Sequence, residues 1–84
     1  MNKRQAFREF VRLAPDLTWQ ERATLRFVAI FRWDEVETLL NSAAAEKAGV
    51  ADVAALEAPG APTIDWLALL MELLPIILKY FFNR

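Results

Sequence analysis

The sequence contains no histidine, no cysteine and only two glycines. These absences exclude disulfides, thiol nucleophiles, Cys/His zinc sites and histidine-based catalytic triads. Two isolated glycines also exclude a glycine-rich phosphate-binding loop. The paired carboxylates, such as Asp34 and Glu37, stand where a helix is expected to begin, and acidic side chains there stabilise the helix dipole. We therefore expect no enzymatic activity, no catalytic residue, no cofactor and no metal ion.

The sequence instead has an excess of apolar residues. Hydrophobic residues make up 56% of the 84 positions, against about 45–50% in a soluble globular chain, which argues against disorder. A chain this short builds only a small core, and natural chains of this size add a disulfide, a metal site or association. Because disulfides and Cys/His metal sites are excluded, we expect association with copies of the chain, with a partner or with lipid.

The charges are distributed unevenly along the chain. The formal net charge is -1, but residues 1–32 carry a net +4, residues 33–65 a net -6 and residues 66–84 a net +1. A basic first part and an acidic middle attract each other, either within one chain or between copies. The same pattern is also typical of two solvated faces of one domain.

Helix signals in residues 1–58 predict a small helical head of about three helices. Apolar residues at helical spacing predict the first helix over residues 2–14, which Pro15 ends. The capping box Thr18-x-x-Glu21 opens the second helix. Asp34 is expected to cap the third helix, and Gly49 to end it in a left-handed conformation. Asp52 is expected to cap a further short helix over residues 53–58.

Arg4, Arg8 and Arg12 stand at four-residue steps along the first helix. A basic amphipathic helix of this kind can bind a membrane surface or the phosphates of nucleic acid. More often such a helix lies on a protein surface with its aromatic residues in the core. Nucleic-acid binding through these three arginines is therefore a remote alternative.

Residues 27–31 are apolar on every side of a helix, which predicts a segment buried all round. Apolar residues also alternate from Leu25 to Trp33, a pattern that fits a strand. We expect a helix, because the capping box leads into the segment. No second strand candidate would pair with it.

The segment Pro59-Gly60-Ala61-Pro62 cannot be helical and predicts a linker over residues 59–62. It separates the head, residues 1–58, from a tail, residues 63–84. Thr63 is expected to cap one long, very apolar C-terminal helix. Pro75 removes one backbone hydrogen bond and is expected to kink that helix.

Most of the circumference of the expected tail helix is apolar, far more than a surface helix buries. The polar exceptions Asp65, Glu72 and Lys79 recur every seven residues, which places them in one narrow polar stripe. The remaining face predicts an association surface. Its members are Trp66, Leu67, Leu70, Leu73, Leu74, Ile77, Leu78 and Phe81.

These patterns favour an all-α structural or assembly protein that self-associates or docks on a protein partner through the C-terminal helix. A minor component of a phage particle or another large assembly, or a cytoplasmic protein, would suit such a chain. The alternative is a tail-anchored or pore-forming membrane protein with residues 64–82 in lipid. Nineteen residues match the bilayer thickness, but the central Glu72 and Pro75 make spanning energetically marginal.

Overall fold

The computed structural model describes residues 2–50, 60 and 63–83. Within these residues the chain forms five α-helices and no strand, which confirms the all-α prediction. Residues 24–33 are accordingly helical, apart from the junction at Arg32. The helices are α1 (Lys3–Leu13), α2 (Trp19–Phe31), α3 (Trp33–Ala48), α4 (Trp66–Glu72) and α5 (Leu74–Phe82).

Side chains form hydrogen bonds with the backbone groups at both ends of helix α1. Asn2 and Gln5 form a reciprocal capping box at its start. At its end, the Arg22 guanidinium of α2 donates hydrogen bonds to three backbone carbonyls. The last carbonyls of a helix have no intrahelical donor and carry partial negative charge, so one arginine satisfies several of them at once. Arg22 thereby holds α2 against α1. Its acceptors are the carbonyl oxygens of Val11 at 2.6 Å, Arg12 at 3.0 Å and Ala14 at 2.7 Å.

The expected capping box of α2 is present, because the Thr18 and Glu21 side chains each accept the other residue's backbone N–H. The end of α3 also follows the prediction, with Gly49 left-handed at φ 71°. Its start differs. Asp34 lies inside the first turn, and the N-cap position is taken by Arg32, whose side chain makes no capping hydrogen bond. The helix therefore begins directly from the break that ends α2.

The expected long C-terminal helix is two helices, which corrects the sequence prediction. α4 ends at Glu72, and α5 begins at Leu74 with Pro75 in its first turn. Proline has no N–H to donate to the Met71 carbonyl, and its ring clashes with that carbonyl in a continuous helix. The predicted kink is thus a complete break. Asp65 caps α4 by accepting from the Ala68 N–H, so the helix also begins later than a Thr63 cap predicts.

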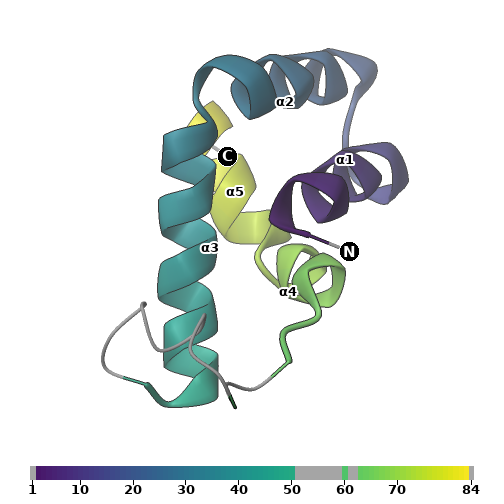
Figure 1. Ribbon diagram of the computed structural model, residues 1–84. Helices are drawn as coiled ribbons and strands as arrows, with labels where there is room; N and C mark the ends of the chain where they lie inside the picture. The colour runs from purple at the N-terminus through teal and green to yellow at the C-terminus, as the bar shows by residue number, and fades with distance from the viewer. Residues whose placement is uncertain (1, 51–59, 61–62, 84) are drawn as a thin grey trace.

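The five helices surround one core, and α1 packs on α4 more extensively than on any other element (Figure 1). α2 lies across one end of α3, while α1 and α4 lie beside α3 (Figure 1). Phe7, Phe10, Leu25, Leu40 and Leu70 are the largest fully buried side chains. They come from α1, α2, α3 and α4, so residues on both sides of the 59–62 segment build the same core.

Ion pairs between the basic first part and the acidic middle of the chain form within the molecule. The Lys3 ammonium lies 3.3 Å from the Glu37 carboxylate and donates to the Asn41 side chain at 3.0 Å. It also lies 5.5 Å from the centre of the Trp66 ring. Lys3 therefore connects α1 with α3 and α4. The expected linker, apart from Gly60, and the expected helix at 53–58 lie outside the described residues.

Candidate functional site

The predicted association face of the tail is largely turned into the core of its own chain. Four of its members are buried, and the other four are partly buried and pack against the core. The buried members are Leu70, Leu74, Ile77 and Leu78, and the partly buried ones are Trp66, Leu67, Leu73 and Phe81. This face gained intramolecular partners because the break after Glu72 lets α4 and α5 fold back separately. The exposed surface available for association must therefore lie elsewhere.

The polar stripe of the tail is exposed at all three positions. Asp65 caps α4, and Glu72 accepts from the Lys47 ammonium at 2.9 Å, which connects the end of α4 to α3. Lys79 lies in the last turn of α5, where a cation is favourable to the helix dipole. Among the described helices, none has the length and apolar character that crossing a membrane requires.

The large exposed apolar side chains of the described residues are concentrated on α2. Seven large hydrophobic side chains are exposed in this part of the chain, and four of them belong to this helix. They are Trp19 at 76% exposed, Phe27 at 55%, Ile30 at 70% and Phe31 at 67%. Residues 27–31 are therefore not buried all round as their composition predicts, because only Val28 of this run is fully buried.

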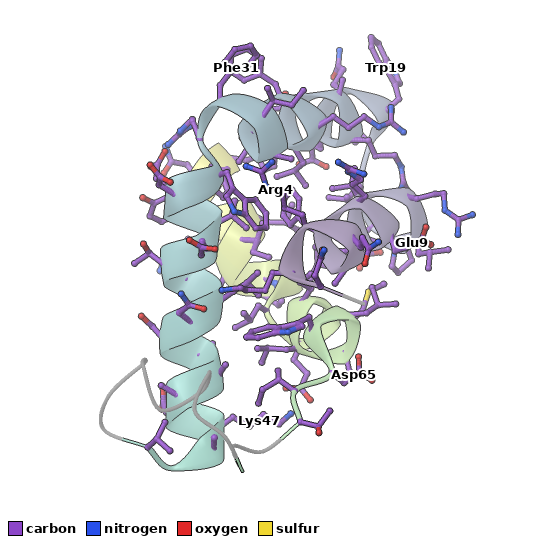
Figure 2. The ribbon with its side chains drawn as sticks, viewed as in Figure 1. Arg4, Glu9, Trp19, Phe31, Lys47 and Asp65 are labelled. Carbon is purple, nitrogen blue, oxygen red and sulfur yellow. The ribbon has the colours of Figure 1, made fainter. Side chains whose placement is uncertain are left out.

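These exposed residues share one side of α2, which we call the outer face. It consists of Trp19, Ala23, Phe27, Ile30 and Phe31. Their spacing of three and four residues is that of a helical stripe. Trp19 and Phe31 mark its two ends and point away from the other helices (Figure 2). The Phe27 and Phe31 rings pack on each other with centroids 4.5 Å apart. The outer face is therefore an ordered apolar ridge.

The inner side of α2 carries Leu25 and Val28, which are buried against α1 and the rest of the core. The helix thus has two apolar faces, and the chain itself covers one. The sequence signal for this arrangement was present, since an all-round apolar helix needs partners on both sides. What the sequence could not show was which side the other four helices leave open.

A groove of about 540 Å³ lies between α1 and α2, and we call it the α1–α2 groove. Most of the surface that lines the groove is formed by apolar atoms, and Ile30 connects the groove to the outer face. Four arginines and one glutamate add a net positive charge. The lining consists of Phe7, Val11, Ala29, Ile30 and Trp33 as apolar members and Arg4, Arg8, Arg12, Arg26 and Glu9 as charged members.

The three arginines predicted as a basic helix face all line this groove and are all exposed. Arg4 lies over the Trp33 ring, with its guanidinium carbon 5.2 Å from the ring centre, and Figure 2 shows it beside the start of α3. Arg12 forms an ion pair with Glu9, one turn earlier on α1. Arg8 has no ion pair or hydrogen bond within the described part of the chain, and Arg26 on α2 has none either.

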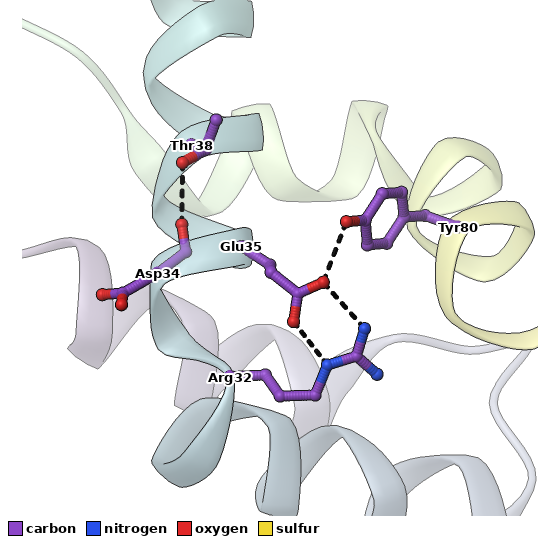
Figure 3. Close-up of polar contacts among 5 residues, drawn as sticks. All are labelled: Arg32, Asp34, Glu35, Thr38 and Tyr80. Carbon is purple, nitrogen blue, oxygen red and sulfur yellow. Dashed lines mark hydrogen bonds and ion pairs between the residues drawn. The ribbon is translucent and has the colours of Figure 1, made fainter.

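A cluster of polar side chains, Arg32, Glu35 and Tyr80, lies at the junction of α2, α3 and α5 (Figure 3). The Arg32 guanidinium donates to the Glu35 carboxylate, and the Tyr80 hydroxyl donates to the same carboxylate at 2.9 Å. These hydrogen bonds from Arg32 and then Tyr80 stabilise the charged carboxylate and lower the pKa of Glu35 from 4.5 to about 2. The same hydrogen bond to Glu35 raises the pKa of Tyr80. The cluster connects α5 with α3 and with the junction that follows α2.

Thr38 completes this part of α3 by donating its hydroxyl to the Asp34 carbonyl at 2.8 Å (Figure 3). Within the described residues, no three acidic side chains converge in a group that could hold a metal ion. No protein-family model, no curated protein and no solved structure matches the chain. Within the described residues, the outer face of α2 and the α1–α2 groove are surface features suited to binding another molecule.

Proposed function

We propose that this chain is a non-enzymatic, all-α assembly protein that self-associates through the outer face of α2. The observation that carries the proposal is the exposure of Trp19, Phe27, Ile30 and Phe31 on one side of a helix whose other side is already buried. Contiguous exposed apolar patches of this kind mark association sites. A chain too short for a large core, with no disulfide, also has most to gain from association.

The outer face is self-complementary when two copies of α2 pack antiparallel. Centring the pair near Leu25 places Trp19 opposite Phe31 of the second copy. The small Ala23 then lies opposite Phe27 of the second copy, and the symmetry repeats both contacts. A small residue facing a large one lets two helices approach closely and interdigitate. A two-fold interface of this kind uses the same patch on both copies and closes without forming a filament.

Simple energetics set the expected strength of the dimer. Covering the exposed part of a large apolar side chain contributes about 1–2 kcal/mol. Eight such side chains meet across the interface and contribute roughly 8–16 kcal/mol in total. Association itself costs several kcal/mol in lost translational and rotational freedom. We therefore expect a dissociation constant between about 1 µM and 1 mM.

Sedimentation velocity across that concentration range tests the proposal. The parent chain should shift from monomer to dimer, and Phe27→Gln/Phe31→Gln should remain a monomer at every concentration. Because both rings are exposed, the double variant should keep the helix content of the parent. The matched control is Leu13→Gln/Ile76→Gln, which changes two exposed apolar side chains outside α2 and should dimerise like the parent.

Two results would refute this proposal. One is a parent chain that remains monomeric up to about 1 mM. The other is an equal loss of dimer in the α2 variant and in the Leu13→Gln/Ile76→Gln control. That result would show non-specific hydrophobic association without a defined interface.

A further inference from the structure

The α1–α2 groove combines an apolar floor with a basic rim, and this combination is separate from the self-association surface. Phe7, Val11 and Trp33 form part of the floor, whereas the outer face of α2 shares only Ile30 with the groove. The rim has arginines on both sides: Arg4, Arg8 and Arg12 from α1, and Arg26 from α2. A ligand that fits this groove needs both an apolar surface and negative charge.

Most arginines of the rim have no ion-pair partner within the described residues. Glu9 is the one acidic residue in the lining, and it pairs with Arg12. Arg4 lies over the Trp33 ring and makes no hydrogen bond or ion pair within the described residues, so its N–H donors are open to a ligand. Arg8 and Arg26 have no ion pair or hydrogen bond in the part of the chain that the structure describes. The guanidinium groups of Arg8 and Arg26 can therefore donate hydrogen bonds to new carboxylates without losing an existing partner.

The spacing of the rim defines the shape of the ligand. Arg4, Arg8 and Arg12 follow each other at four-residue steps on α1 and span roughly 12 Å along its axis. Carboxylates at three- or four-residue steps on a second helix repeat at nearly the same distance. Two helices that diverge around an apolar floor also provide the groove into which an amphipathic helix packs.

We propose that the α1–α2 groove is the docking site for an acidic amphipathic helix of a partner protein. The apolar face of that helix covers Ile30, Ala29 and the edge of Trp33. Its glutamates or aspartates, on the flank of that face, pair with Arg8 and Arg26, and with Arg4 over the Trp33 ring. Charge complementarity of this kind orients a partner and accelerates its encounter.

The described helices of a second copy do not supply this ligand. α3 carries much of the chain's acidic charge, but none of its described residues is a large exposed hydrophobic side chain that could cover the floor. On α5, Ile76 and Tyr80 are exposed, but the basic Lys79 lies on the same helix, and the Glu35 carboxylate next to Tyr80 is already paired with Arg32. Among the described helices nothing combines an exposed apolar face with free carboxylates, so we assign the ligand to another protein.

Nucleic acid fits the groove less well than an acidic helix. Phosphate groups would pair with the arginines, but a phosphate backbone has no apolar face for a floor of Ala29, Ile30 and Trp33. Glu9 also lies within the row of α1 arginines and would repel a continuous phosphate track. Binding of a DNA duplex is included below as an opposing outcome.

The experiment compares two synthetic amphipathic helices with the same leucine face. One carries glutamate at four-residue steps beside that face, and its matched control carries glutamine at the same positions. Fluorescence anisotropy with the full chain should show binding of the glutamate peptide at least about tenfold tighter than the glutamine peptide, as two or three exposed ion pairs allow. The difference should shrink with added salt.

Matched variants separate the groove from overall charge. Arg8→Gln/Arg26→Gln should weaken binding of the glutamate peptide about tenfold and leave the glutamine peptide unaffected. Lys47→Gln/Lys79→Gln removes the same net charge outside the groove lining and should change neither affinity. Phe27→Gln/Phe31→Gln, which lies outside the lining, should retain the preference for the glutamate peptide even as a monomer.

The proposal fails if the two peptides bind equally, if neither binds, or if the arginine and lysine variants weaken the glutamate peptide to the same extent. It also fails if a short DNA duplex displaces the glutamate peptide at a lower concentration than unlabelled peptide does, because the groove would then be a nucleic-acid site. Ile30 belongs to both surfaces, so the peptide comparison is repeated with the monomeric Phe27→Gln/Phe31→Gln chain. In that variant the outcome does not depend on dimerisation, and the two proposals are tested separately.

Discussion

At the level of single residues, the cluster of Arg32, Glu35 and Tyr80 predicts that the stability of the fold depends on pH. The pKa of Glu35 is lowered to about 2 in the fold, because Arg32 and Tyr80 donate to its charged form. A carboxylate with a lowered folded pKa stabilises the fold above its unfolded pKa of about 4.5, and this contribution is lost as the pH falls towards about 2. Acid should therefore weaken the attachment of α5 to α3.

The variant Glu35→Gln tests that linkage. It should lower the melting temperature at neutral pH and flatten the decline in melting temperature between about pH 4.5 and about pH 2. Tyr80 is the only tyrosine in the chain, so the ultraviolet absorbance of tyrosinate reports it directly. The raised pKa of Tyr80 should return towards its ordinary value in the variant, because the Glu35 carboxylate is the main cause of the increase.

Glu46→Gln is the control, since Glu46 lies exposed on the same helix and outside this cluster. It should leave both the acid profile and the tyrosine titration unchanged. An identical acid profile in Glu35→Gln and the parent chain would contradict the assigned role of the cluster.

At the scale of elements, the break between α4 and α5 decides what the tail does. Pro75 sits in the first turn of α5, where its missing N–H is not required. Leu73 joins the helices with φ -85° and ψ -1°, a conformation that directs α5 away from the axis of α4. The redirected helix places Ile77 and Leu78 in the core. Pro75 thus excludes one regular continuous helix, and the packing of Ile77 and Leu78 in the core holds α5 in its new direction.

The variant Pro75→Ala should retain the fold and reduce its stability by about 0.5–1 kcal/mol. At a position already compatible with proline, the ring stabilises mainly by restricting the unfolded chain. Urea denaturation followed by circular dichroism measures the difference. Ala68→Gly, an exposed change in the first turns of α4, calibrates the cost of an ordinary helix substitution. A more stable Pro75→Ala chain would indicate that α4 and α5 prefer one continuous helix.

At the scale of the whole molecule, the core depends on the tail as much as on the head. Leu70 of α4 is 0% exposed and belongs to the same cluster as Phe7, Phe10 and Leu40. Leu70→Ala should therefore cost about 2–5 kcal/mol, the usual range for a buried leucine whose cavity does not collapse. A domain of this length has a total stability of roughly 4–13 kcal/mol, so the variant should lose a large share of it.

Urea denaturation of Leu70→Ala beside Ile76→Ala checks this dependence on the tail. Ile76 is 53% exposed on α5, and its truncation should cost less than about 1 kcal/mol. Equal destabilisation by the two variants would mean that α4 does not share the core with α1. The comparison also separates the tail's structural role from the association assigned to α2.

Short-range sequence signals account for the local structure of the described helices. The capping box at Thr18, the stop at Pro15 and the left-handed Gly49 each depend on hydrogen bonds or sterics within a few residues, and all are present. The all-α class followed from the same signals. Local rules were less reliable at two helix starts. Asp65 caps α4 in place of Thr63, and α3 begins from the break at Arg32 with Asp34 inside its first turn.

Which apolar faces are covered depends on how the helices pack together. The tail and residues 27–31 are both apolar nearly all round, and nothing in their composition distinguishes the one that the chain itself buries. The packing of the helices distinguishes the two segments. α4 and α5 fill the space beside α1 and α3, whereas Phe27, Ile30 and Phe31 on the outer face of α2 remain exposed to solvent. Burial is a property of the arrangement of all the helices, because each apolar face needs a second face opposite it. For that reason a pattern along one helix shows that it must be covered but not by what.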